Sequence, residues 1–263
     1  MRTDILSQPG TPAYICSFPK SGRTWLRFML VHILVSHYGL PVELDFHTFF
    51  AVIPNDEGHP EKGWPAYRFG NEIPCVAASH QAYDKEIHDG HLVVFLLRDP
   101  RDVLVSFWLH QSRQFSRYTG DLSSFIRHEK YGIKFLVNYM ESWVDATLTK
   151  RTLVTTYEDM HADVPAALRA VCVFLGIPAS EEEIFAAAAN GSFQRMQALE
   201  LRGGIAGHRY DRSDKSALRV RRGLVRGYSE HLRAADEKYI GSVIASATAG
   251  VQAMLGRTGY QAR

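Results

Sequence analysis

Short apolar runs alternate along this chain with longer stretches of helical pattern. Four runs read as strands, at 13–18, 76–79, 92–97 and 152–156. The run at 92–97 is apolar throughout, which is typical of a strand in a parallel sheet that is covered on both faces. The pattern therefore predicts a buried parallel sheet.

Helical patterns separate these runs. Apolar positions from 25 to 35 lie almost all round a helix, which indicates a buried helix, and Gly39 ends it. Further helices are predicted at 103–109, 131–148, 165–175 and 181–189, the last of them opened by a capping box of Ser180 and Glu183. This alternation predicts a three-layer α/β fold, a parallel sheet flanked by helices on both faces.

The segment 43–72 shows neither pattern. It is rich in His, Pro and Gly, and its aromatic residues are Phe46, Phe49, Phe50, Trp64, Tyr67 and Phe69. A stretch of this length without periodicity is usually functional. We expect a long functional loop or lid at 43–72, the alternative being that some of its rings pack against the sheet.

Composition indicates one globular domain spanning residues 1–263, with 46% hydrophobic and 22% charged residues. A net charge of +2 excludes a protein that coats nucleic acid, so no nucleic-acid partner is expected. Residues 195–233 nevertheless hold ten basic and four acidic side chains. This concentration predicts a local anion site.

The cysteines and the N-terminal sequence predict a cytoplasmic protein. Cys16, Cys75 and Cys172 lie far apart without a CxxC spacing, which favours reduced thiols. The N-terminal sequence has no continuous apolar region like that of a secretory signal. The longest apolar stretch, 25–35, is shorter than the roughly 20 residues that span a bilayer. No zinc-type cluster of Cys, His and acidic residues occurs, so no metal is expected.

A polar loop at 19–24 joins the first predicted strand to the first predicted helix. Gly22 allows close approach of the backbone to a ligand, and successive N–H groups at a helix N-terminus favour an anion such as phosphate. The loop is not a Walker A motif, because no glycine stands at the required distance before Lys20. The alternative is an ordinary turn with an exposed lysine.

Three motifs together resemble one enzyme family. The string SFPKSGRTWLR at 17–27 resembles the 5′-phosphosulfate loop of the cytosolic-type sulfotransferases, which use 3′-phosphoadenosine 5′-phosphosulfate (PAPS). The strings VVFLLRDPRDVLVSF at 93–107 and VRRGLVRGY at 220–228 are similar to the second and third motifs of that family. The resemblance runs from about residue 13 to about residue 235 and implies a P-loop-like fold with a C-terminal cofactor-binding segment at 209–232.

The resemblance also implies the roles of individual residues. Those implied to bind the cofactor are Lys20, Ser21, Gly22, Arg23, Thr24, Trp25, Arg98, Ser106, Tyr157, Phe193, Arg221, Arg222 and Gly223. Arg98 and Ser106 correspond to the residues that hold the 3′-phosphate. Two residues depart from the family pattern: Arg23 replaces a Thr and adds a cation near the phosphosulfate, whereas Arg226 replaces a Gly and leaves the fold of the C-terminal loop open.

In-line sulfuryl transfer needs a cation on the leaving oxygen and a base on the nucleophile. The resemblance implies that Lys20 is the cation. His80 is the candidate base, because it ends the run at 76–79 where the family places its histidine. Ala78 and Gln81 depart from the family pattern around it, and His88 and His91 are its nearest competitors.

The implied activity is a PAPS-dependent sulfotransferase without a metal, which would form a sulfate ester and adenosine 3′,5′-bisphosphate (PAP). The acceptor would be a hydroxyl of a small molecule, glycan or lipid, and the aromatic residues of 43–72 predict an apolar or planar part in it. Two alternatives stay open: a P-loop-type kinase that uses ATP, with Asp99 at a magnesium ion, and a non-catalytic nucleotide sensor. The sequence does not indicate an oligomeric state.

Overall fold

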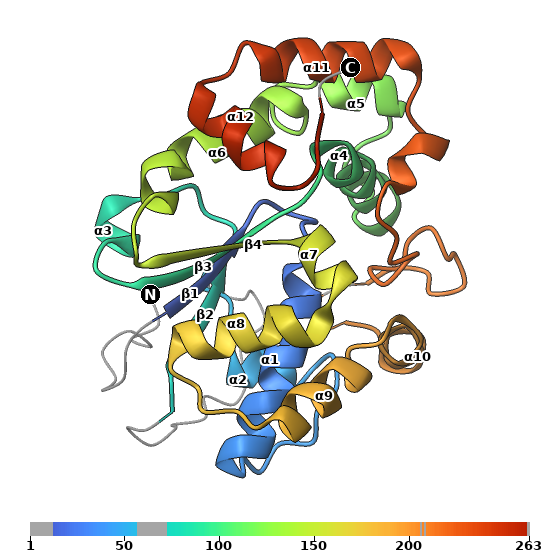
Figure 1. Cartoon of the computed structure of the whole chain (residues 1–263). Helices are drawn as coiled ribbons and strands as arrows, with labels where there is room; N and C mark the ends of the chain where they lie inside the picture. Colours follow the sequence, from blue (N-terminus) through green and yellow to red (C-terminus); the bar gives the residue numbers. More distant parts are fainter. Residues whose placement is uncertain (1–12, 57–72, 206, 208, 262–263) are drawn as a thin grey trace.

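The computed structural model describes residues 13–56, 73–205, 207 and 209–261. Four parallel strands form one sheet in the order β2-β1-β3-β4 (Figure 1). The strands are β1 (Ala13–Ser17), β2 (Val76–Ser79), β3 (Leu92–Leu97) and β4 (Thr152–Thr156). All four predicted strands are therefore confirmed, and their carboxyl ends meet at one edge, where ligands bind in open α/β sheets.

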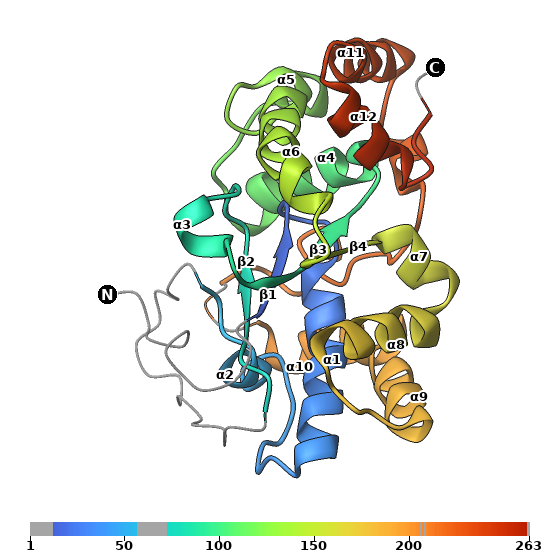
Figure 2. The same cartoon turned by 60° about the vertical axis from the view of Figure 1, so that its left-hand side comes forward.

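Helices cover both faces of this sheet (Figures 1 and 2). One face carries α4 (Pro100–Leu109), α5 (Leu122–Arg127), α6 (Ile133–Thr147), α11 (Ala234–Ala245) and α12 (Ala249–Gly256). The other carries α1 (Arg23–Tyr38), α2 (Phe49–Val52), α8 (Val164–Leu175) and α9 (Glu181–Asn190). The connections contain α3 (Lys85–His88), the π-helix η2 (His110–Gln114), α7 (Tyr157–Ala162), α10 (Phe193–Gly203) and the 3-10 helix η3 (Gly227–Glu230).

Alternating side chains of each strand enter two separate cores. Tyr14 and Cys16 of β1 pack beneath the α4 and α6 layer, whereas Ala13 and Ile15 pack beneath α1 and α8. Burial on both sides explains why β3 is apolar throughout. The three-layer α/β architecture is confirmed.

Helix ends follow the predicted signals. Ser180 and Glu183 form the capping box of α9, and Gly39 closes α1 in a left-handed conformation with its N–H bonded to the Val35 carbonyl. The helix predicted at 103–109 begins earlier, at Pro100, because the side chain of Asp99 accepts a hydrogen bond from the Arg101 N–H. A proline at the first turn is compatible with this start.

The segment 43–72 is only partly a loop. It contains α2, and Phe46 and Phe49 are buried against Phe28 of α1, with ring centroids 5.2 and 5.9 Å from that ring. For these two rings the structure matches the alternative, in which rings of this segment pack in the interior, through one tilted and one edge-to-face contact with Phe28. Trp64, Tyr67 and Phe69 lie outside the described residues.

Candidate active site

The loop after β1 turns sharply into α1. Lys20 and Gly22 both have left-handed backbones, with φ of 73° and 102°. Such a φ is strained for a residue with a side chain, so the surrounding structure must hold Lys20 in place. At Gly22 an added Cβ would lie 2.6 Å from Cδ2 of Tyr157, so only glycine fits. The loop thus places Lys20 at the N-terminus of a 16-residue helix, a position that favours binding of an anion.

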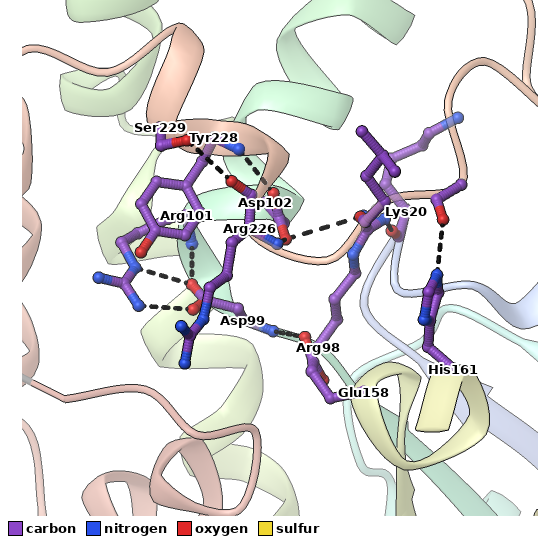
Figure 3. A network of polar contacts seen from close by, with 12 residues as sticks. Lys20, Arg98, Asp99, Arg101, Asp102, Glu158, His161, Arg226, Tyr228 and Ser229 are labelled. Atoms are coloured by element: carbon purple, nitrogen blue, oxygen red, sulfur yellow. Dashed lines mark hydrogen bonds and ion pairs between the residues drawn. The ribbon is translucent and has the colours of Figure 1, made fainter. Parts of the chain in front are cut away.

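Arg98, at the end of β3, ties three distant segments together (Figure 3). Its Nη1 donates to the Lys20 carbonyl at 3.1 Å, and its Nη2 donates to the Leu224 carbonyl at 3.1 Å. The guanidinium also lies 4.0 Å from the ring centroid of Tyr157. One side chain therefore connects the anion loop, the C-terminal segment and α7.

A cavity of about 860 Å³ opens where these segments meet. Its wall contains nearly all residues that the sequence assigned to the site: Lys20, Gly22, Arg23, Thr24, Trp25, His80, Arg98, Ser106, Tyr157, Phe193, Arg221, Arg222 and Gly223. Ser21 is the exception, because it is fully buried behind the loop, and its Oγ has no hydrogen-bond partner among the described residues. The structure thus brings together residues from six separate stretches of sequence.

Positive charge dominates the cavity wall near Lys20. Burial lowers the pKa of Lys20 well below 10.5, and the charges of Arg219, Arg98 and Arg221 lower it further. The wall also contains Asp102, but this carboxylate accepts the backbone N–H groups of Arg226 and Tyr228, both at 2.8 Å (Figure 3). This part of the cavity is therefore suited to a ligand with several negative charges.

His80 reaches the same cavity from the end of β2. Its Nδ1 donates to the Ser17 carbonyl at 2.7 Å, and since a carbonyl only accepts, Nε2 carries the lone pair of the neutral ring. Burial and the charge of Arg23 lower the pKa of His80 well below 6.5. The imidazole is consequently neutral at pH 7, in the form that can accept a proton.

The two competing histidines lie elsewhere. His88 is buried in α3, with its ring centroid 4.8 Å from that of Trp143. The ring of His91 packs on Tyr14 at 5.5 Å. Neither side chain lines the cavity, so both are structural.

The C-terminal segment folds over the site despite the departure at position 226. Arg226 adopts the left-handed conformation, with φ of 62°, and Asp102 holds its N–H. His161 of α7 donates through Nε2 to the Gly223 carbonyl at 2.9 Å. Arg222, although it lines the cavity, forms a two-pronged ion pair with Glu230 at 2.6 and 2.7 Å. Asp102 and α7 thus anchor this segment from two sides.

Aromatic groups also line the cavity beside the cations. Trp25 donates to the Gly191 carbonyl at 2.8 Å, and its ring lies 5.4 Å from that of Tyr157. A Cβ at Gly223 would lie 2.8 Å from Cδ2 of Phe193, so this ring packs directly on the C-terminal segment. Flat apolar walls beside cations suit a nucleobase attached to phosphates.

The remaining part of the cavity is a mixed aromatic and polar chamber that the sequence analysis missed. Its wall contains Phe50, Asn55, Phe107, His110, Gln111, Phe115, Tyr131 and Phe135. Of the aromatic residues expected from 43–72, Phe50 is the described one that lines it. Half of these residues lie in α4, η2 and α6. Positions 107, 110, 111 and 115 continue the helical spacing from Ser106, a signal that could have found them.

The kinase alternative loses its support at Asp99. Both carboxylate oxygens are bound by Arg101, with Nε at 3.0 Å and Nη2 at 2.6 Å, and the residue does not line the cavity (Figure 3). In the part of the chain that the structure describes, His, Cys, Asp and Glu form no group of three that could hold a metal ion. The same residues include no helix long and apolar enough to cross a bilayer.

Known proteins that are similar to this chain in sequence and in fold include sulfotransferases. Sulfotransferase 2A6 of Mus musculus is 27% identical over 196 residues, covering 70% of this chain and 65% of the relative. Sulfotransferase 2A1 of Macaca fascicularis is 26% identical over 239 residues, covering 84% of this chain and 78% of the relative. A mouse sulfotransferase solved with PAP superposes with a TM-score of 0.67 at 19% identity, covering 98% of this chain and 92% of that one.

The match to the family extends along the chain. Residues 11–252 match the family described as the sulfotransferase domain. The aligned region spans somewhat less than two thirds of the mouse relative's own length, so its whole activity does not transfer by similarity alone. The extent of the domain match nevertheless settles the family: this chain belongs to the sulfotransferase domain family.

Proposed function

We propose that this protein transfers a sulfuryl group from PAPS to the hydroxyl of a small-molecule acceptor. The observation that carries the proposal is the junction at Arg98, which joins the anion loop to the C-terminal segment beside a wall of cations. In this proposal Lys20 binds the 5′-group, and Arg98 and Ser106 bind the 3′-phosphate, as the resemblance to the family implies; all three residues line the cavity. A nucleotide with phosphates at both ends fits this arrangement.

Lys20 and His80 would perform the transfer from opposite sides of the reacting group. His80 accepts the acceptor's hydroxyl proton at Nε2 as the new S–O bond forms, and Lys20 neutralises the phosphate oxygen as the old S–O bond breaks. A bound anion raises the pKa of Lys20 again, so the lysine is charged when it is needed. Arg23 adds a second cation beside the ring of His80.

The mixed chamber supports an acceptor with a planar or apolar body and one further polar group. Phe107, Phe115 and Tyr131 provide the apolar surface. Gln111 is buried, and its Oε1 has no hydrogen-bond partner among the described residues. Leaving such a group unsatisfied costs about 1–3 kcal/mol, so a ligand that donates to it gains affinity. A glycan or lipid acceptor has no comparable support.

The proposed cytoplasmic location has the support of one relative's name, Cytosolic sulfotransferase 14 of Arabidopsis thaliana.

Thermal stabilisation by nucleotides tests the proposal. PAP should raise the melting temperature and ATP should not, because the pair of terminal phosphates is specific to PAP. Lys20→Ala should retain PAP binding and lower turnover with PAPS by orders of magnitude, since its charge acts mainly in the transition state. Stabilisation by ATP alone would support a kinase, and PAP binding without turnover on any hydroxyl acceptor would support a sensor.

A further inference from the structure

Arg219 occupies a central position that the established family motifs do not include. It precedes the motif at 220–228 and lines the main cavity. It also lines a small adjoining cavity of about 20 Å³ together with Lys20 and Ser106. The Arg219 side chain thus lies in the cation-rich part of the site, near Lys20.

A buried carboxylate fixes the backbone of Arg219. Glu200 of α10 is fully buried and accepts the N–H groups of Arg219 and Val220, both at 2.7 Å. Tyr210 donates its hydroxyl to the same carboxylate, and Gln197 Nε2 donates to the Val220 carbonyl at 2.9 Å. Three hydrogen bonds therefore hold residues 219 and 220, and the bond from Tyr210 holds the Glu200 carboxylate, so the backbone from which the Arg219 side chain extends is fixed.

The charge of Arg219 acts on both residues that would carry out the transfer. It lowers the pKa of Lys20, where it is the largest effect after burial, and it also lowers the pKa of His80. Burial lowers its own pKa from 12.5, but a guanidinium stays protonated in proteins. Arg219 is therefore a permanent cation in the wall of the cavity that Lys20 and His80 also line, and it shares the small adjoining cavity with Lys20.

We propose that Arg219 contacts the sulfuryl oxygens of PAPS and is a third catalytic residue of the transfer. The inference rests on the proposed function. Lys20 serves the bond that breaks and His80 serves the bond that forms, so a cation close to both lies beside the sulfur atom between them. Arg219 donates hydrogen bonds to the equatorial oxygens and exchanges no proton, whereas the acceptor's proton goes to His80. Glu200 is its positioning residue.

Comparing the affinities for PAPS and PAP in variants tests this role, because PAP lacks only the sulfuryl group. We expect Arg219→Gln to weaken PAPS binding by about tenfold or more, the loss of a charge-assisted contact, and PAP binding by less than about threefold. The affinity of Arg219→Lys for PAPS should lie between those of the wild type and of Arg219→Gln. Arg209→Gln is the matched control, because Arg209 is exposed, lies outside the cavity and belongs to the same segment. Isothermal titration measures all affinities, and thermal melts verify folding.

Two results would overturn the inference. An equal loss for PAPS and PAP would make Arg219 a holder of the nucleotide phosphates, and no loss for either would remove it from the site. If Arg219→Gln does not fold, the same comparison in Arg219→Lys decides. A wild-type protein that binds neither nucleotide would instead refute the proposed function, and the inference with it.

Discussion

Replacing Gly22 by alanine tests the geometry of the anion loop. The backbone φ of 102° is unfavourable for an L-residue by about 1–2 kcal/mol. The new Cβ would also lie 2.6 Å from Tyr157 Cδ2, and that ring cannot retreat freely because Arg98 and Trp25 pack on it. Overpacking of this kind costs about 1–3 kcal/mol. We therefore expect a total loss of about 2–5 kcal/mol, which lowers the melting temperature by about 4–20 °C.

Gly90→Ala separates the two contributions. Gly90 has a similar φ of 80°, but nothing lies within 4 Å of an added Cβ, so this variant has the backbone cost without the contact. Thermal melts and PAP titrations of both variants provide the measurement. Gly22→Ala should be the less stable of the two and should bind PAP at least about tenfold more weakly than wild type, with Gly90→Ala unchanged in affinity. Equal stability and equal PAP affinity would refute the loop geometry.

Two further predictions concern titrating groups. In the free protein, NMR should show a pKa of His80 below the ordinary value of 6.5, and bound PAP should raise that pKa because it brings negative charge. His80→Gln identifies the NMR signal and should abolish turnover. A pKa at or above 6.5 in the free protein would contradict the geometry. Burial raises the pKa of Glu158 to about 7, so its ionisation between about pH 4.5 and 7 opposes folding as the pH rises. Glu158→Gln should therefore stabilise the protein at pH 8 by about 1–2 kcal/mol after solvent screening, and not at pH 4.5, as thermal melts at both pH values would show.

The parts of the fold set by local pattern were predictable. The strands, α1 and the cap of α9 depend on hydrophobic period and on residues within one turn, and the structure confirms them. The structure of the segment 43–72 was not predictable, because Phe46 and Phe49 enter the core through contacts with Phe28, which lies more than 15 positions earlier in the sequence. No periodicity within a segment records a partner outside it.

Part of the site was predictable from local sequence and part was not. Lys20, Arg98 and Ser106 belong to contiguous motifs, so their types and spacing could be read directly. The mixed chamber depends on the π-helix η2, whose i→i+5 bonding has no sequence signal, although its residues still follow Ser106 at helical spacing. Of the segment 43–72, from which the acceptor was predicted, Phe50 lines the chamber, and Trp64 and Tyr67 lie outside the described residues.

The basic residues of 195–233 show why a charge count cannot locate a site. Arg222 lines the cavity but is paired with Glu230, whereas Arg212 donates to two carbonyls at the end of α10 and does not line the cavity. Arg219 differs from them because Glu200 holds its backbone. A carboxylate in a helix ordinarily faces solvent, and Glu200 is fully buried here with three groups that donate hydrogen bonds to it. Sequence supplies the charges, but long-range hydrogen bonds, such as those of Arg219 and Val220 to one buried acid, set where the charged residues lie in the fold.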